Sequence, residues 1–293
     1  MTGVELQDGT ATAVDIDDGG RVLARGVAGG NNLSAAALAA LDSIAASPSR
    51  ALAVASVNPE SPATLAAMKA IAGRYPATVQ REPAVASGTA AAVAEAWIGA
   101  ARGKKDVVYF AVADHTAAGV LHDAVPMTGV NRRAPAVGWL ALNPVEREDY
   151  RKTGCLEAEV AAAGVVRRLV WRIKAGDRSQ VQEAAGGDLS AISIDHVLDA
   201  ARAGDGVSIS VIRDTAKYLG MAAANLVVMA DPEILVLGGI MTSAADLLLE
   251  QVRSEITRRL PGPMMQALTI VPAALGADAP AIGVARLAAA MVP

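Results

Sequence analysis

Asp114, His115 and Thr116 stand together directly after an apolar segment in the middle of the chain. Residues 106–112, DVVYFAV, read as a buried strand, so these polar side chains are expected where that strand ends. A histidine beside an aspartate at such a place could bind a ligand or accept a proton. A pair exposed to solvent in a loop would have the same sequence. We therefore treat Asp114 and His115 as candidate catalytic residues.

Other signatures of catalysis or metal binding are missing from the sequence. The three histidines, His115, His122 and His196, show no HExxH spacing, and no phosphate-binding Gx4GK[ST] or GxGxxG motif occurs. The single cysteine, Cys155, excludes an internal disulfide and cannot by itself form a four-ligand zinc site. We expect no metal site, and the cysteine content fits a reducing cytoplasm.

Composition narrows the class of protein. The chain has 293 residues, of which 53% are hydrophobic, and a net charge of −4. No apolar segment approaches the roughly 18 residues of a membrane span, and no secretory leader opens the chain. The basic segment 165–174, VVRRLVWRIK, is typical of an amphipathic helix with solvated arginines rather than of a nucleic-acid surface. We expect a cytoplasmic protein that binds neither nucleic acid nor membrane.

Strands and helices alternate along the chain. Apolar segments bounded by turn residues predict strands at 10–16, 21–26, 50–56, 106–112, 119–125, 234–237 and 267–273. Helical spacing predicts helices at 34–47, capped by Ser34, from Pro62 onward, at 87–102, over much of 155–229 and at 281–292. This alternation indicates an α/β fold. We expect an N-terminal lobe at 1–105 and a C-terminal lobe at 106–293, with the final helix packing back on the first lobe.

Four stretches in a fixed order resemble the ROK family of bacterial sugar kinases and sugar-responsive repressors. They are DGT with GGRVLARG, then AAAVAEAWIGAARGKKDVVYF, then GCLEAEV, then DPEILVLGG with LGADAPAIGVARLA, and together they cover nearly the whole chain. The resemblance implies the actin-like ATPase fold, which is RNase H-like, with two lobes and a central cleft that holds ATP and sugar.

The resemblance also implies positions for nucleotide binding. The family's first phosphate loop, DxGGT, matches ELQDGT, where Asp8, Gly9 and Thr10 keep part of the turn and Glu5 or Asp8 could replace the aspartate near the metal. An ordinary turn in a hairpin would give the same residues. In the well-kept segment ILVLGGI, Gly238 and Gly239 match glycines that approach adenine or ribose.

The second phosphate loop departs from the family pattern. Where the family has GTGxGGG, this chain has ADHTAAG, of which only Gly119 remains. Such glycines let backbone N–H groups approach phosphate oxygens. Asp114 places a carboxylate there, and each such charge pair costs on the order of 4 kcal/mol unless a metal intervenes. The loop therefore argues against ordinary ATP binding.

The catalytic position also differs from the family. Ser87 matches the aspartate that accepts the proton of the sugar hydroxyl, and serine is no base at neutral pH. We expect Ser87 to be the N-cap of the helix at 87–102. Glu82 is the nearest acidic residue and could replace the aspartate only if the chain bends back into the cleft.

The sugar and zinc motifs of the family are altered as well. Glu157 matches a glutamate that contacts sugar, although an acidic residue in the first turn of a helix would be equally ordinary. Ala136 replaces a second sugar glutamate, and Trp139 replaces a zinc-binding histidine and is expected to fill the space by apolar packing. Glu148 and Tyr150 replace two zinc cysteines, so zinc is not expected.

These losses lead to two hypotheses and a weaker third. The first is a ROK-like pseudokinase that senses a small-molecule ligand or acts as a scaffold, as a homodimer. The alternative is an active kinase using Mg-ATP, with a sugar or pantothenate-like substrate and relocated catalytic groups: Asp8, Glu82, Asp114 or His115. DNA-binding repression is least favoured, because the chain opens directly in the first expected strand of the lobe, with no helix-turn-helix before it.

Overall fold

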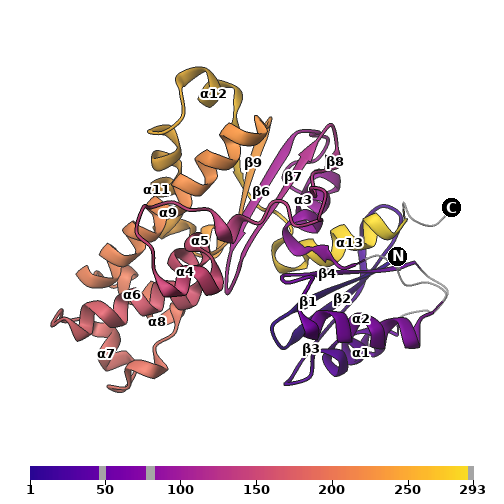
Figure 1. The fold of residues 1–293 in the computed structure, drawn as a ribbon, viewed down its shortest axis with the longest axis horizontal. Coiled ribbons are helices and arrows are strands. Elements are labelled where there is room, and N and C mark those ends of the chain that lie inside the picture. Colours follow the sequence, from indigo (N-terminus) through magenta and orange to yellow (C-terminus); the bar gives the residue numbers. More distant parts are fainter. Residues whose placement is uncertain (46–50, 77–82, 290–293) are drawn as a thin grey trace.

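The computed structural model describes residues 1–45, 51–76 and 83–289. Two five-stranded sheets lie side by side, each flanked by helices, and form two lobes (Figure 1). The predicted two-lobed α/β fold is therefore confirmed. Among the described helices none is both long and apolar enough to cross a membrane, and that includes the 25-residue α9.

The N-terminal sheet has the order β3-β2-β1-β4-β5. Its strands are β1 (Thr2–Gln7), β2 (Thr10–Ile16), β3 (Val22–Gly29), β4 (Leu52–Ser56) and β5 (Val85–Ala86). The hairpin β1–β2 is antiparallel, whereas β1 and β4 are parallel. One face is covered by α1 (Leu33–Ser43) and α2 (Pro62–Arg74). The side chain of Asn32, rather than the expected Ser34, caps α1 by accepting a hydrogen bond from Ala35.

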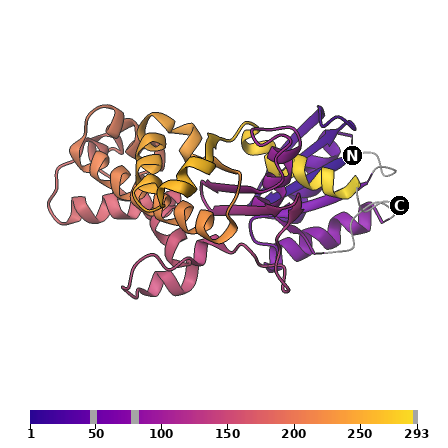
Figure 2. The same ribbon diagram turned by 90° about the horizontal axis from the view of Figure 1, so that it is seen from above.

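Two helices join the sheets. α3 (Ser87–Trp97) packs on β6 and β7 of the second sheet, and α13 (Ala279–Ala289) packs on β1 and β4 of the first. The two helices cross with almost no space between them, because a Cβ at Gly283 would lie 1.7 Å from the carbonyl oxygen of Ala90. Figure 2 shows both helices between the sheets. They fix where the cleft between the lobes begins.

The C-terminal sheet has the order β10-β9-β6-β7-β8. Its strands are β6 (Val107–Val112), β7 (Thr116–His122), β8 (Val125–Pro126), β9 (Ile234–Gly239) and β10 (Thr269–Pro272). β6 and β9 are parallel, and both end at the cleft, where Val112 pairs with Gly239. Residues 113–115 turn from β6 into the antiparallel β7. The Asp114–His115 pair therefore lies at the carboxyl edge of the parallel strands.

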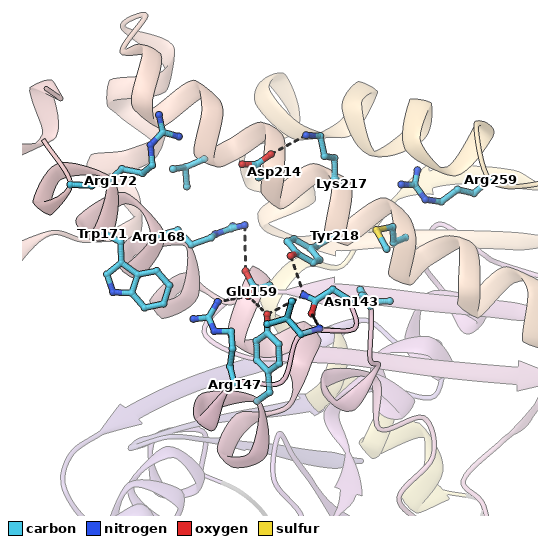
Figure 3. Close-up of a pocket in the computed structure, with 16 residues that line it drawn as sticks. Asn143, Arg147, Glu159, Arg168, Trp171, Arg172, Asp214, Lys217, Tyr218 and Arg259 are labelled. Atoms are coloured by element: carbon cyan, nitrogen blue, oxygen red, sulfur yellow. Dashed lines mark hydrogen bonds and ion pairs between the residues drawn. The ribbon is translucent and has the colours of Figure 1, made fainter. Parts of the chain in front are cut away.

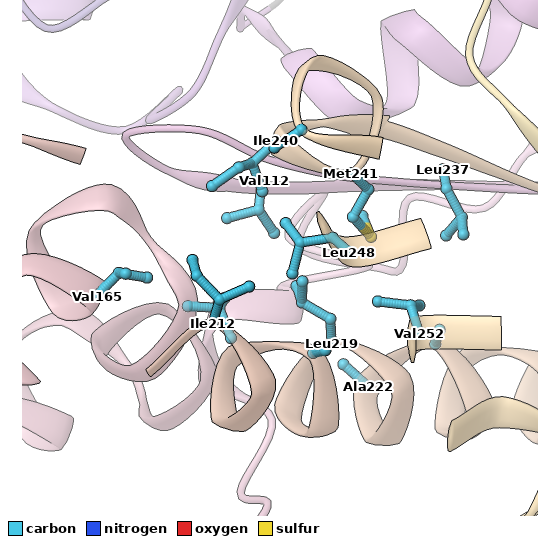
Figure 4. Close-up of a cluster of buried hydrophobic side chains, with 14 of the residues drawn as sticks. Val112, Val165, Ile212, Leu219, Ala222, Leu237, Ile240, Met241, Leu248 and Val252 are labelled. Atoms are coloured by element: carbon cyan, nitrogen blue, oxygen red, sulfur yellow. The ribbon is translucent and has the colours of Figure 1, made fainter. Parts of the chain in front are cut away.

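The remaining helices belong to the C-terminal lobe or lie just before α13, and several of them pack on the long helix α9. They are η1 (Val137–Trp139), α4 (Glu148–Thr153), α5 (Cys155–Val160), α6 (Ala162–Lys174), α7 (Gln180–Ala184), η2 (Leu189–Ala191), α8 (Ile194–Arg202), α9 (Gly206–Ala230), α10 (Ile240–Ser243), α11 (Ala245–Thr257), α12 (Gly262–Ala267) and η3 (Gly276–Asp278). Leu219 of α9 packs with Leu248 of α11 under the sheet residues Val112 and Leu237 (Figure 4). This core holds the ends of β6 and β9 in place.

Candidate active site

A cavity of about 710 Å³ lies between the lobes, within the range of about 300–1,000 Å³ usual for small-molecule sites. It is formed by the ends of β1, β6 and β9, the start of α3, and parts of α8, α10 and the segment before α13. Asp114, His115 and Gly239 line it, together with Glu5 and Ser87. The cavity is large enough for a nucleotide.

A second cavity of about 200 Å³ adjoins the first. Its polar lining includes Asn58, Glu60, Arg133 and Glu157. Val57, Ser87 and Ala117 line both cavities, so the two spaces meet at the first turn of α3. This arrangement can hold two molecules side by side, with their reacting ends at Ser87.

Glu5 places a buried carboxylate at this meeting point. It belongs to β1, is 2% exposed, and lines the larger cavity. Burial raises the pKa of Glu5 to about 7, although the nearby Ser87 and Gln7 side chains favour its charged form. Its Oε2 atom makes no hydrogen bond of ordinary geometry with any described residue. A carboxyl group with a pKa near neutrality and an open acceptor position is suited to accept a proton.

Ser87 does not have the expected capping role. The N-cap residue of α3 is Ala86, and no side chain caps this helix. Ser87 is the first helical residue, 3% exposed, and its Oγ has no hydrogen-bond partner among the described residues. The N-cap prediction is therefore wrong, because the helix begins one residue earlier than the capping pattern required. The Ser87 hydroxyl nevertheless lies close enough to the Glu5 carboxyl to favour the charged form of that group.

His115 contacts two carboxylates, neither of them the adjacent Asp114. Its Nδ1 lies 3.1 Å from Oε1 of Glu157, and its Nε2 lies 2.9 Å from Oδ2 of Asp8. The Glu157 hydrogen bond is the main reason why the pKa of His115 rises to about 9. The imidazole is thus protonated at neutral pH and cannot serve as the proton acceptor that the sequence suggested. It supplies a positive charge at the end of β6 instead.

Glu157 holds the turn between β6 and β7. Its Oε2 accepts hydrogen bonds from the backbone N–H of Thr116 at 3.0 Å and from the Thr116 hydroxyl at 2.7 Å. Burial alone would raise the pKa of Glu157, but the bonds from His115 and Thr116 lower it. Glu157 also lies in the first turn of α5 and lines the smaller cavity, so both sequence interpretations describe its position. Its contact with sugar stays a prediction.

The predicted nucleotide-binding residues do not lie together. Asp8 and Gly9 line a separate cavity of about 130 Å³ beside Asn58, although Asp8 reaches the cleft through His115. Thr10 opens β2, where it pairs with Gly29. Glu82 lies outside the described residues. Of Asp8, Gly9 and Thr10, the structure therefore connects only Asp8 to a residue of the large cavity.

The three other glycines that were predicted to bind nucleotide, Gly119, Gly238 and Gly239, lie in different surroundings. A Cβ at Gly119 would lie 2.2 Å from the carbonyl oxygen of Gly88, so Gly119 lets α3 pack on β7 and does not line the larger cavity. Gly238 faces the Tyr109 hydroxyl within the sheet. Gly239 has a φ of +64° and lines the larger cavity, and its role in nucleotide binding stays a prediction.

The altered zinc motif also folds differently from the expectation. Trp139 is 59% exposed at the rim of the smaller cavity, so the prediction that it fills internal space is wrong. The η1 turn directs it outward, because Gly138 is packed against Glu157 and Thr116. Cys155 is buried, and in the part of the chain that the structure describes no group of three or more metal-ligating side chains occurs.

The sequence did not suggest Glu5 as a proton acceptor. From the sequence, Glu5 was expected only as an alternative to Asp8 near a metal. The feature that could have indicated a role for Glu5 is its place between Val4 and Leu6, in the buried part of β1, residues 2–6. Such a residue is rarely placed in a core without a function.

Curated relatives of this chain include glucokinases and N-acetylglucosamine repressors. The chain is 30% identical over 196 residues to the glucokinase of Halalkalibacterium halodurans, a match that covers 66% of this chain and 59% of that protein. It is 27% identical over 194 residues to the glucokinase of Thermotoga maritima, with 66% and 61% covered. The matched segment thus spans about three fifths of the length of these relatives.

A solved structure shares the whole fold. The Streptomyces griseus ROK family glucokinase in complex with glucose and AMPPNP superimposes with a TM-score of 0.82 over 99% of both chains, at 20% identity. The pseudokinase hypothesis is wrong, because the chain is 30% and 27% identical to the two curated glucokinases. That hypothesis rested on side chains that differ at single positions such as Ser87, and it named Glu5 only as a possible replacement for the aspartate near the metal.

The family itself follows from a match over most of the chain. The sequence model described as "ROK family" matches residues 45–291. These residues contain both helices that join the lobes, α3 and α13, and every strand of the C-terminal sheet. The chain belongs to the ROK family.

Proposed function

We propose that this protein is an ATP-dependent kinase that phosphorylates a hydroxyl group of a sugar, with Glu5 as the proton acceptor. The observation that carries the proposal is the buried Glu5 carboxylate, with its pKa near 7, beside Ser87 where the two cavities meet. The similarity to glucokinases supports a sugar as the acceptor. The nucleotide occupies the larger cavity and the sugar the smaller one.

Phosphoryl transfer needs an acceptor oxygen in line with the γ-phosphate and a group that takes its proton. Ser87 lines both cavities, so an acceptor hydroxyl at Ser87 would face the larger cavity and Glu5. A carboxylate on β1 thereby replaces a carboxylate at the start of α3. His115, protonated through Glu157 and Asp8, stabilises negative charge on the transferred group.

Asp114 is suited to hold the magnesium ion that accompanies ATP. Mg²⁺ binds through one or two carboxylates together with phosphate oxygens, and Asp114 lines the larger cavity with the Gln7 amide. The ion would neutralise charge on the phosphates. Its presence would also remove the repulsion between Asp114 and phosphate that the sequence suggested.

The test is an ADP-release assay with Mg-ATP and glucose, mannose, N-acetylglucosamine and pantothenate. For the sugar that is phosphorylated, Glu5→Gln lowers kcat by about 10²–10⁴-fold, the range for loss of a general base, with little change in the KM for ATP. Ser87→Ala is the matched control and changes kcat less than about tenfold. In the Glu5→Gln background, Ser87→Asp recovers part of kcat, because it places a carboxylate at the same meeting point.

The possible outcomes distinguish the proposed kinase activity from the proposed role of Glu5 as its proton acceptor. Failure to phosphorylate any sugar would contradict the proposed function. Sugar phosphorylation that survives Glu5→Gln at nearly full kcat would leave the kinase in place and exclude Glu5 as its proton acceptor.

A further inference from the structure

Another cavity, also of about 710 Å³, lies in the C-terminal lobe, away from the cleft. It is formed by α6, α9 and the segment 142–150, and it shares no lining residue with the two cavities of the cleft (Figure 3). The proposed kinase reaction does not use it. Its size suits a small organic molecule.

The lining of this cavity is predominantly positive. Its cationic side chains are Arg147, Arg168, Arg172, Lys217 and Arg259. Only Glu159 and Asp214 contribute negative charge to the lining. Two of these arginines come from the segment 165–174 that the sequence suggested would be solvated. They line a cavity instead, where Arg168 pairs with Glu159 and Arg172 with Asp177.

Arg168 is the least exposed of these cations, and it donates a hydrogen bond to the Thr215 hydroxyl and lies over the Tyr218 ring. Its side chain is 14% exposed, and the nearest carboxylate, Glu159, is 3.6 Å away. Its Nε is buried and has no hydrogen-bond partner among the described residues. Burial lowers the pKa of Arg168. A buried guanidinium with an unused donor is costly, and an anion in the cavity would reduce that cost.

The other feature is a layer of flat side chains. The guanidinium of Arg147 lies 4.7 Å from the ring centre of Trp171 and 5.1 Å from that of Tyr150. Asn143 donates to the hydroxyl groups of Tyr150 and Tyr218 at 3.1 and 3.3 Å. These contacts hold the rings in fixed orientations. Trp171 nevertheless remains 47% exposed, although the guanidinium groups of Arg147 and Arg167 both lie over its ring.

Glu159 holds two side chains of the cavity wall in place. It pairs with Arg147 at 3.1 Å and accepts a hydrogen bond from Tyr150. Arg172 is paired outward with Asp177 and Ser210, and Arg259 with Glu255. The cations are thus fixed around an open space by bonds at its walls. This is the arrangement of a preformed anion site.

We propose that this cavity binds an organic anion in which a carboxylate or phosphate group is attached to a flat aromatic body. The anionic group contacts Arg168, and the aromatic body covers Trp171. Binding here does not depend on the proposed kinase activity, because the cavity is separate from the cleft.

The experiment uses calorimetry on the intact protein with phenyl phosphate, benzoate, benzyl alcohol and inorganic phosphate, together with tryptophan fluorescence. Phenyl phosphate or benzoate is expected to bind, and which of the two binds more tightly identifies the anionic group. Benzyl alcohol and inorganic phosphate bind at least about tenfold more weakly, because each lacks one half of the interaction. The fluorescence change disappears in Trp171→Phe.

Variants complete the test. Arg168→Met weakens binding of phenyl phosphate by at least about tenfold, and Arg172→Gln weakens it if the first variant does not fold. The matched control is Arg102→Met, an exposed position outside the cavity, which leaves binding unchanged. The proposal is overturned if neither aromatic anion binds, if benzyl alcohol binds equally well, or if both cavity variants bind as the wild type does.

Discussion

Glu5→Gln should make the protein more stable above neutral pH while it removes catalysis. The carboxyl group of Glu5 is 2% exposed, and its pKa rises from 4.5 to about 7 on folding because burial disfavours the charged form. Between those pH values the unfolded chain has lost the Glu5 proton and the folded chain keeps it. Stability therefore falls as pH rises from about 4.5 to about 7, and stays lowered above that.

The size of the effect follows from the same difference. Each pKa unit corresponds to about 1.4 kcal/mol, so ionised Glu5 costs the folded state about 3 kcal/mol above pH 7. A glutamine has nearly the same shape and no charge. At pH 9 the free energy of unfolding of Glu5→Gln should thus exceed that of the wild type by about 2–3 kcal/mol, and at pH 5 the two should be almost equal.

The assay is urea unfolding of both proteins at half-unit steps from pH 4.5 to 9. Glu250→Gln serves as the control, because Glu250 is 84% exposed and should show no such pH dependence. A constant difference between Glu5→Gln and wild type across the whole pH range would refute the reasoning, since it would mean that Glu5 titrates alike in both states. A gain in stability together with a loss of kcat would identify Glu5 as a group kept for function at a cost in stability.

Three further predictions follow from the same contacts. The pKa of His115, followed by NMR, should fall from about 9 toward 6.5 in Glu157→Gln and fall less in Asp8→Asn, because the Glu157 hydrogen bond is the larger cause and Asp8 is 82% exposed; an equal fall in both would contradict this. Gly119→Ala should lower the free energy of unfolding by about 1–3 kcal/mol or more, measured in urea, because its Cβ would overlap the backbone of Gly88; unchanged stability would show that α3 can shift. The stabilising bonds of protonated His115 should be present below about pH 6.5 and lost as pH rises through about 9, so the wild type should lose stability there and His115→Gln should not.

The fold could be predicted from local patterns because the apolar residues of each segment follow either the spacing of a helix or that of a strand. The strands β6 and β9 and the helix start at Pro62 lie where the apolar segments and the proline placed them. Helix caps were less certain, since Ser34 and Ser87 both fit the capping pattern but are internal or first helical residues. A cap depends on the backbone angle of one residue, and neighbouring polar residues compete for it.

The site was harder to predict because it is assembled from residues far apart in the chain. The sequence placed His115 beside Asp114, but the folded chain gives it Asp8 from one lobe and Glu157 from the other. Its protonation follows from those two carboxylates and cannot be read from its neighbours. The role of Ser87 depends in the same way on Glu5 in a strand that adjacent sequence does not reveal.

The substitutions in the phosphate loop and at the catalytic position are better understood together than separately. A glycine-rich loop binds phosphate through backbone N–H groups, whereas here the cation at the same strand end is His115, whose two ring nitrogens also contact Glu157 and Asp8. A carboxylate at the start of α3 is missing, but Glu5 lies opposite that start on β1. In each case the chemical group is supplied by another element that ends at the cleft. What this active site requires is a charge at a given place, and the α/β cleft allows more than one strand or helix to provide it.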